Sequence, residues 1–263
     1  MTLFTVARNA MRPAYLPTMA HKVYLRLRHG HDRERKAAEG WAGAHAQDMD
    51  AWGRRADPAL WEESVAFART LETSARPTVE RVAAAGVDLG GPAGIELLYF
   101  LTRALRPAVA LETGVAAGWS TAAILGGLAA NGGGQLYSSD FPLFRISHPE
   151  RYIGCVVPPE LRDSWSLHIK GDRRNLPEIL SHVPPIGLSH YDSDKTRNGR
   201  EYFLHRVRPH TAPRHVLVMD DIQDNLVFRE HAATYPAFRV FAYQGKYIGL
   251  TGPGLPAVER GSR

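Results

Sequence analysis

The chain has 263 residues, of which 44% are hydrophobic and 22% are charged, and it contains one cysteine. These values are ordinary for a folded protein, and they exclude a disordered chain, a disulfide framework and a zinc site built on cysteines. No apolar stretch approaches the length of a membrane span and the N-terminus lacks a signal-peptide pattern, so the sequence predicts a cytoplasmic protein.

The formal charge of +5 is concentrated at the N-terminus. Residues 1–36 contain eight Lys and Arg residues against two acids, whereas the rest of the chain is close to neutral. A basic arm can contact nucleic acid, an anionic surface or a protein partner, but a solvated or oligomer-forming extension explains it more simply. We predict a basic arm with short helices over residues 1–57, and we leave a homo-oligomer open.

Two helices are predicted between this arm and the core. Apolar residues recur at helical spacing over residues 58–85, and a second apolar helix is expected over Ile95–Leu105. From residue 108 onward, short apolar runs alternate with helical segments, which is typical of a parallel sheet with crossover helices. The five runs are Val109–Glu112, Gln135–Ser139, Ser166–Lys170, Ile186–Tyr191 and Val216–Met219.

Two further runs, Phe238–Tyr243 and Tyr247–Leu250, are separated by three residues, which suits a hairpin and is too short for a crossover helix. We therefore predict an α/β domain over residues 58–263. Its sheet is doubly wound, mostly parallel, seven-stranded and Rossmann-like, it ends in an antiparallel hairpin, and a helical N-terminal extension precedes it. Residues 141–165 form a long connection without periodicity, so we predict a lid there.

The segment 110–121 combines a strand, a glycine turn and the start of a helix. Gly114 and Gly118 would let a ligand approach the backbone closely, and the helix start offers free N–H groups to a carboxylate. Ser120 and Thr121 would add hydroxyl donors for the same carboxylate. On glycine spacing alone, a structural tight turn explains the pattern nearly as well.

Asp140 closes the next strand, roughly 20 residues beyond the turn, where a carboxylate can accept both hydroxyls of a ribose. A nicotinamide enzyme would share this acid, but Glu112-Thr113-Gly114 does not follow the glycine register of pyrophosphate binding. The pattern E-x-G-x-x-x-G resembles the first motif of class I methyltransferases, which use S-adenosylmethionine. The resemblance implies that the donor is held by Glu112, Gly114, Gly118, Ser120, Thr121, Asp140 and, beside the adenine ring, Asp172. For Asp172, a helix cap is an equally good explanation.

Acidic residues also follow the fourth and fifth strands, where a parallel sheet places its ligands. Asp192 comes after the fourth strand, and Asp220 and Asp221 come after the fifth. Three carboxylates brought together there repel one another unless a cation neutralises them, and oxygen ligands favour Mg²⁺. Asn225 offers a further oxygen that could replace one member of the trio. The alternative is that Asp220 and Asp221 only cap a following helix.

The pattern D-x-x-K followed by D-D resembles the divalent-metal O-methyltransferases, and with the first motif it is similar to methyltransferase family 24. The resemblance implies that Asp192, Asp220 and Asp221 bind the metal and that Lys195 lies near the acceptor hydroxyl. His190 shares a strand face with Asp192 and is a second candidate base. We therefore expect a Mg²⁺-assisted, S-adenosylmethionine-dependent O-methyltransferase of small-molecule hydroxyls, on sugars, polyols or natural-product scaffolds first and phenols second, with Lys195, His190 and Asp192 as the catalytic residues.

Two other functions stay open. A nicotinamide-dependent oxidoreductase would use the same sheet and Asp140, and binding of nicotinamide or of S-adenosylhomocysteine separates the two. A protein that binds RNA through the basic arm would lose its salt-dependent affinity for RNA when residues 1–36 are deleted. Nucleic acid is not the expected partner, because nothing else in the sequence indicates a groove for a polyanion.

Overall fold

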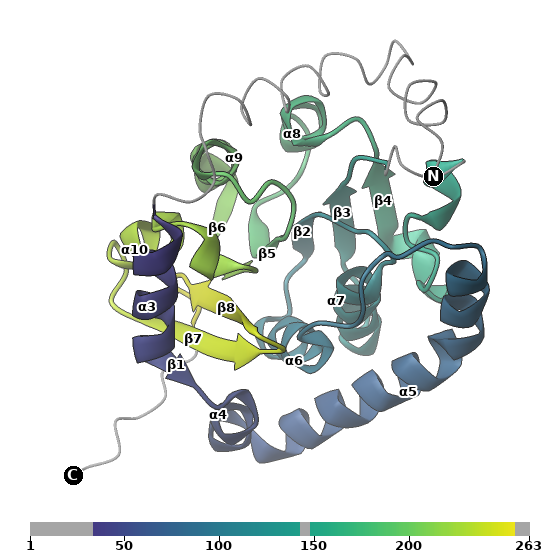
Figure 1. The fold of residues 1–263 in the computed structure, drawn as a ribbon, viewed down its shortest axis with the longest axis horizontal. Helices are drawn as coiled ribbons and strands as arrows, with labels where there is room; N and C mark the ends of the chain where they lie inside the picture. Colours follow the sequence, from purple (N-terminus) through teal and green to yellow (C-terminus); the bar gives the residue numbers. More distant parts are fainter. Residues whose placement is uncertain (1–33, 143–147, 256–263) are drawn as a thin grey trace.

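A computed structural model of the chain describes residues 34–142 and 148–255 (Figure 1). This part of the chain forms a sheet of eight strands in the order β1-β7-β8-β6-β5-β2-β3-β4. The strands are β1 (Ala46–Gln47), β2 (Val109–Thr113), β3 (Gln135–Ser139), β4 (Trp165–His168), β5 (Ile186–Tyr191), β6 (Thr211–Met219), β7 (Phe238–Tyr243) and β8 (Lys246–Thr251). The α-helices are α3 (Arg35–His45), α4 (Met49–Ala56), α5 (Pro58–Ala84), α6 (Ile95–Leu105), α7 (Trp119–Ala130), α8 (Asp172–Leu180), α9 (Arg197–Val207) and α10 (Val227–Ala232). Short 3₁₀ helices are η1 (Pro149–Tyr152), η2 (Pro159–Ser164), η3 (Arg208–His210) and η4 (Ile222–Asp224).

The five central strands are parallel, as predicted. β2 pairs with β3 on one side and with β5 on the other, β3 continues to β4, and β5 continues to β6. The strand order therefore reverses between β2 and β5, and the carboxyl ends of these strands open on one edge of the sheet. Open α/β sheets bind their ligands at such a reversal.

The C-terminal hairpin closes the sheet in the predicted antiparallel way. β8 lies between β6 and β7 and runs antiparallel to both. Gln244 and Gly245 in the turn have φ values of 48° and 77°, as a tight two-residue hairpin turn requires. The predicted fold class is thus confirmed, with one addition at the edge.

That addition is the two-residue strand β1, which pairs in parallel with β7 and brings the sheet to eight strands. A two-residue strand leaves no periodic pattern, so the sequence did not reveal it. The extension also adds α3, whose Ala42 is buried in the core. The domain boundary at residue 57 stays a prediction, and the basic arm over residues 1–33 lies outside the described part of the chain.

Each face of the sheet carries its own hydrophobic core. Helices α4, α5, α6 and α7 cover one face, with Leu98 and Leu125 among the buried side chains. Helices α3, α8, α9 and α10 cover the other (Figure 1), with Phe203 and Phe228 among its buried side chains. Burial of this apolar surface is the main force that holds the sheet edge, and hence the site, in place. None of the described helices is both long and apolar enough to cross a bilayer.

Candidate active site

The glycine turn after β2 is organised by a buried carboxylate. Glu112 is fully buried and accepts hydrogen bonds from Ser120 Oγ at 2.6 Å, Thr121 Oγ1 at 2.6 Å and Ser138 Oγ at 2.8 Å. A buried carboxylate needs such donors, because it has lost its hydration. Glu112 therefore ties the start of α7 to β3 and holds the turn in shape.

The two glycines of the turn are required by neighbouring backbone. A Cβ on Gly114 would lie 2.3 Å from the carbonyl oxygen of Asp192, and a Cβ on Gly118 would lie 2.8 Å from Cα of Gly154. Both residues also have positive φ, at 85° and 97°. The close contacts are thus within the protein, and Gly114 holds the glycine turn against the loop that carries Asp192.

Asp140, at the end of β3, faces the same turn. One carboxylate oxygen accepts from the backbone N–H of Ala116 at 2.9 Å and of Val115 at 3.3 Å, and the other accepts from Phe141 N–H at 2.6 Å. Burial raises the pKa of Asp140 to about 6, although these N–H groups oppose the rise. A carboxylate in this state gains from further hydrogen-bond donors.

Asp172 is the first residue of α8 and directly follows the N-cap residue Gly171. Its carboxylate accepts from Ser139 Oγ at 2.6 Å and from Ser193 Oγ at 2.5 Å. Asp172 therefore links the ends of β3 and β5 beside Asp140. This bridge between two strand ends is compatible with a further role at the start of the helix.

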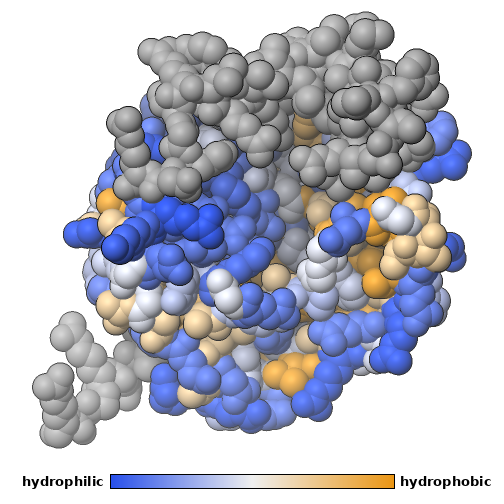
Figure 2. All heavy atoms as spheres, in the orientation of Figure 1, coloured by the Kyte–Doolittle hydropathy of each residue, from blue (hydrophilic) through white to orange (hydrophobic). Residues whose placement is uncertain are grey.

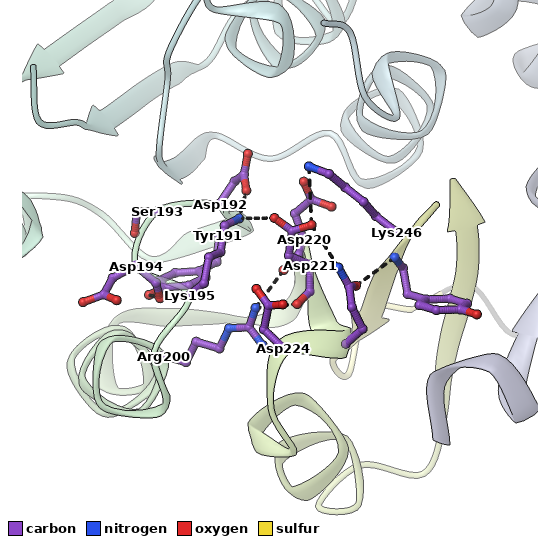
Figure 3. A network of polar contacts seen from close by, with 12 residues as sticks. Tyr191, Asp192, Ser193, Asp194, Lys195, Arg200, Asp220, Asp221, Asp224 and Lys246 are labelled. Carbon is purple, nitrogen blue, oxygen red and sulfur yellow. Dashed lines mark hydrogen bonds and ion pairs between the residues drawn. The ribbon is translucent and has the colours of Figure 1, made fainter. Parts of the chain in front are cut away.

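An acidic cluster forms where β5 and β6 end (Figure 3). Asp192, Asp220 and Asp221 each offer an oxygen within 4.8 Å of the others. Asp220 Oδ1 is buried and has no hydrogen-bond partner among the described residues. Burial, reinforced by the charge of Asp192, raises the pKa of Asp220 to about 6. The backbone of Asp221 is left-handed, with φ of 52°, and its side chain does not cap the following η4.

Two lysines face this acidic cluster from different elements. Lys195 contacts Asp192, and its Nζ lies 2.9 Å from Asp221 Oδ2. Lys246, from β8, places its Nζ 3.4 Å from Asp221 Oδ1 (Figure 3). Burial opposes the charge of Lys195, but the carboxylates outweigh it and raise its pKa, so the side chain is an ammonium at neutral pH. The sequence had indicated Lys195 but not Lys246.

His190 lies between the acidic cluster and Glu112. Its ring is buried, and its Nδ1 is 3.6 Å from Glu112 Oε1. Burial opposes protonation of the ring, but nearby carboxylates, above all Glu112, raise the pKa of His190. The predicted position of His190 on the same strand face as Asp192 fits the structure, since both border one cavity.

Arg200 is a second residue that the sequence did not indicate. It is fully buried on α9, and its guanidinium donates to the carbonyl oxygens of Asp220 at 3.2 Å and Asp221 at 2.7 Å. It also donates to Asn225 Oδ1, while the Asn225 amide donates to the carbonyl of Lys195. Asn225 therefore supports the backbone of the acidic cluster through Arg200 and Lys195.

These groups meet around a cavity of about 370 Å³, here called the main cavity. The glycine turn, the strand ends, the hairpin and the segment before α6 line it, through residues that include Gly114, Ser120, His190, Asp192, Asp220, Lys246 and Leu89. Thr121 does not reach it: the side chain is fully buried and its hydroxyl binds Glu112 instead of facing a ligand. Of the predicted lid, residues 143–147 lie outside the described chain, and Gly154 and Val156 bind the glycine turn through backbone hydrogen bonds.

A family model described as a methyltransferase domain matches residues 111–222. This part of the chain is therefore similar to a methyltransferase domain. It begins in β2 and runs to η4, so it contains the glycine turn, Asp140 and the acidic cluster. A comparison with curated proteins produced no match.

Solved methyltransferase structures share the fold of this chain. An O-methyltransferase from Bacillus cereus in complex with SAH is 19% identical, with a TM-score of 0.55 over 68% of this chain and 88% of that one. The O-methyltransferase TomG from Streptomyces achromogenes, involved in tomaymycin synthesis and solved with SAM, is 16% identical, with a TM-score of 0.51 over 84% and 96%. A methyltransferase from Geobacter sulfurreducens is 14% identical, with a TM-score of 0.51 over 68% and 86%. The predicted class I methyltransferase fold is thereby confirmed.

Proposed function

We propose that the protein is an S-adenosylmethionine-dependent O-methyltransferase of a small molecule, in which a divalent cation such as Mg²⁺ assists. One observation carries the proposal: the glycine turn of the methyltransferase domain and the acidic cluster border the same cavity. A donor and an acceptor could therefore meet there at the strand reversal.

The donor would lie along the glycine turn. Its ribose hydroxyls would donate to Asp140, whose half-buried carboxylate keeps a raised pKa despite its backbone N–H donors. Its amino-acid end would lie near Ser120 and the N-terminus of α7, which favours a carboxylate. Glu112 and Thr121 would act by holding the turn, and Asp172 by holding the strand ends on the adenine side.

The acidic cluster fits a hard divalent cation. Asp192, Asp220 and Asp221 are all-oxygen ligands, and Asp220 Oδ1 is a buried acceptor without a partner. Lys195 and Lys246 offset part of the negative charge, so the site keeps a net negative charge before a cation enters. When bound, the cation would lower the pKa of the acceptor hydroxyl.

Residues of the chain would stabilise charge, take up the proton and position the acceptor. Lys195 is held as an ammonium, so it is a poor base for the acceptor hydroxyl. It would instead stabilise the negative charge on the acceptor oxygen after the proton has left. His190 borders the main cavity and in its neutral form would take the proton. The acceptor oxygen forms a bond to the methyl carbon, and the carbon–sulfur electron pair leaves with the sulfur. Positioning in the cavity supplies much of the rate.

The proposed acceptor is a natural-product scaffold, sugar, polyol or phenol with a free hydroxyl. TomG, which shares the fold, is involved in the synthesis of the natural product tomaymycin, and this supports a scaffold of that class. The apolar wall of the main cavity, with Leu97, Val218 and Ile248, supports an acceptor that is not wholly polar.

Calorimetric titration with S-adenosylhomocysteine, and separately with NADH, tests the donor. We expect saturable binding of S-adenosylhomocysteine and none of NADH. Turnover should then be measured with labelled S-adenosylmethionine against a panel of phenols, sugars and cell extract. Binding of NADH without binding of S-adenosylhomocysteine would support the oxidoreductase instead.

A further inference from the structure

A second cavity of about 320 Å³ lies beside the main cavity. We call it the apolar chamber. The last turns of α5, the loop after α5, the start of α7 and the segment between η1 and η2 line it, through Val79, Val82, Ala83, Gly86, Val87, Asp88, Leu89, Gly90, Ala117, Trp119, Cys155 and Val156. In Figure 2, orange spheres gather on this side of the molecule, beside the end of α5.

The walls of the apolar chamber offer little to a polar ligand. The Asp88 carboxylate accepts from Gly90 N–H at 3.0 Å, so it is engaged in its own loop. Burial raises the pKa of the Cys155 thiol, which therefore stays neutral. Val79, on this wall, is the one large hydrophobic residue exposed in the described chain, at 41%. A cavity with mostly apolar walls is typical of a small-molecule binding site.

The apolar chamber and the main cavity adjoin. Leu89, Gly90, Ala117 and Trp119 line both of them. Gly90 is exposed at this shared wall, and a Cβ placed on it would meet no atom within 4 Å. The opposite wall is fixed, since Val156 N–H donates to the carbonyl of Ala117 at 3.0 Å. A ligand that reaches from the acidic cluster past Leu89 would enter the chamber.

We propose that the apolar chamber binds an apolar substituent of the methyl acceptor, so that the substrate is a hydroxyl compound bearing an alkyl or aryl group instead of a free sugar or polyol. The inference rests on the proposed function, because it assigns the chamber to an acceptor. The donor does not suit the chamber, since its ribose and amino-acid groups need the polar partners at Asp140 and Ser120. The reacting hydroxyl stays at the acidic cluster and the substituent extends along α5.

A homologous series of 4-alkylphenols, from methyl to hexyl, probes the chamber. Binding is measured by calorimetry on the whole chain saturated with S-adenosylhomocysteine, so no turnover is needed. We expect affinity to rise about fourfold for each added methylene, the factor that burial of one CH₂ supplies. Affinity that does not change with chain length would overturn the proposal.

Two variants at neighbouring positions test whether the chamber causes the rise in affinity with chain length. Ala83 lines the chamber and Ala84 does not, and both are exposed on α5. Ala83→Asp places a charge in the chamber and should weaken binding of 4-hexylphenol by more than about tenfold, while 4-methylphenol changes little. Ala84→Asp should leave the whole series unchanged. Equal effects of the two variants would overturn the assignment to this chamber.

The same titrations separate this proposal from the proposed function. If S-adenosylhomocysteine binds but chain length has no effect, the chamber proposal fails and the methyltransferase assignment stands. If S-adenosylhomocysteine does not bind at all, the proposed function fails, and with it the acceptor role of the chamber. If the alkylphenols bind the chain without S-adenosylhomocysteine but not the saturated chain, the chamber belongs to the donor and the proposal is overturned.

Discussion

Asp140 shows how the fold prepares a single residue for a ligand. Its carboxylate is drawn into the sheet edge and held by three backbone N–H groups. Burial nevertheless keeps its pKa at about 6, above the ordinary 3.8. Because the folded-state pKa is raised, the ionised form costs the protein stability as pH rises from about 4 through 6. Two ribose hydroxyls would offset that cost.

Donor-product affinity should therefore depend on pH around this pKa. Above pH 6 the ionised Asp140 accepts both hydroxyls, and below pH 6 protonation removes part of that capacity. We expect S-adenosylhomocysteine to bind about tenfold more weakly at pH 5 than at pH 7, as one protonation near pH 6 implies. Calorimetry across this range checks it. The Asp140→Asn variant should bind weakly at both values, and a slope that survives in this variant would assign the effect to another group.

Substitution of Asp220 tests whether the acidic cluster binds a divalent cation. Asp220→Asn removes one charge from a buried ligand, so binding of Mn²⁺, used as a spectroscopic substitute for Mg²⁺, should weaken by more than about tenfold. Affinity for S-adenosylhomocysteine should change little. Asp194→Asn is the matched control, because Asp194 stands outside the cluster and its carboxylate accepts from Thr196 N–H, a bond that an amide oxygen can keep. Full turnover by wild type in a chelator would show that the lysines alone neutralise the cluster.

At the scale of the element, α9 supports the backbone of the acidic cluster through Arg200. Arg200 donates to the carbonyl oxygens of two adjacent residues at the end of β6, one of which, Asp221, has a left-handed backbone. A left-handed non-glycine residue is strained and persists only where its surroundings fix it. The arginine has no carboxylate partner among the hydrogen bonds of the described residues, and burial lowers its pKa. We infer that it positions the cluster.

Arg200→Leu should destabilise the protein by about 3 kcal/mol, because buried carbonyl oxygens lose their donors. The exposed Arg206 lies on the same helix, and Arg206→Leu should change stability by less than about 0.5 kcal/mol. Chemical denaturation measures both. Under conditions in which both variants are folded, Arg200→Leu should also bind Mn²⁺ less tightly than Arg206→Leu does. Equal Mn²⁺ affinities would leave Arg200 with a structural role only.

At the scale of the whole molecule, His215 makes the stability of the fold depend on pH. It lies on β6, buried, with Nε2 2.9 Å from Ser189 Oγ on the neighbouring strand. Burial lowers the pKa of His215 to about 4. The unfolded chain binds this proton at a higher pH than the folded chain does. Stability is therefore lost as pH falls from about 6.5 towards 4, by up to about 3 kcal/mol.

The free energy of unfolding, measured between pH 7 and pH 4.5, should fall less steeply in His215→Gln than in wild type. Glutamine keeps a polar group for Ser189 without taking up a proton. His205→Gln, at an exposed position of α9, is the control and should keep the wild-type slope. If all three slopes agree, other groups cause the acid sensitivity of the fold.

The order of the elements and the place of the candidate donor residues at strand ends could be predicted from the sequence, because both depend on local patterns. Helical spacing located α6 with its observed bounds, and apolar runs located the strands to within a few residues. The glycine turn, Asp140 and the acidic residues occur at strand ends, and parallel strands bring their carboxyl ends to one edge. That rule was enough to place Asp192, Asp220 and Asp221 together.

Contacts between elements distant in sequence were decided only by the tertiary structure. Lys246 reaches Asp221 because β8 inserts beside β6, and Arg200 reaches the same turn because α9 packs beneath it. Thr121 binds Glu112 instead of facing the cavity, since the exact rotation of α7 decides where its hydroxyl points. The apolar chamber likewise needs α5, α7 and the segment near η2 to meet. Local periodicity determines which face of an element is buried, but the packing of both cores determines which side chains finally touch.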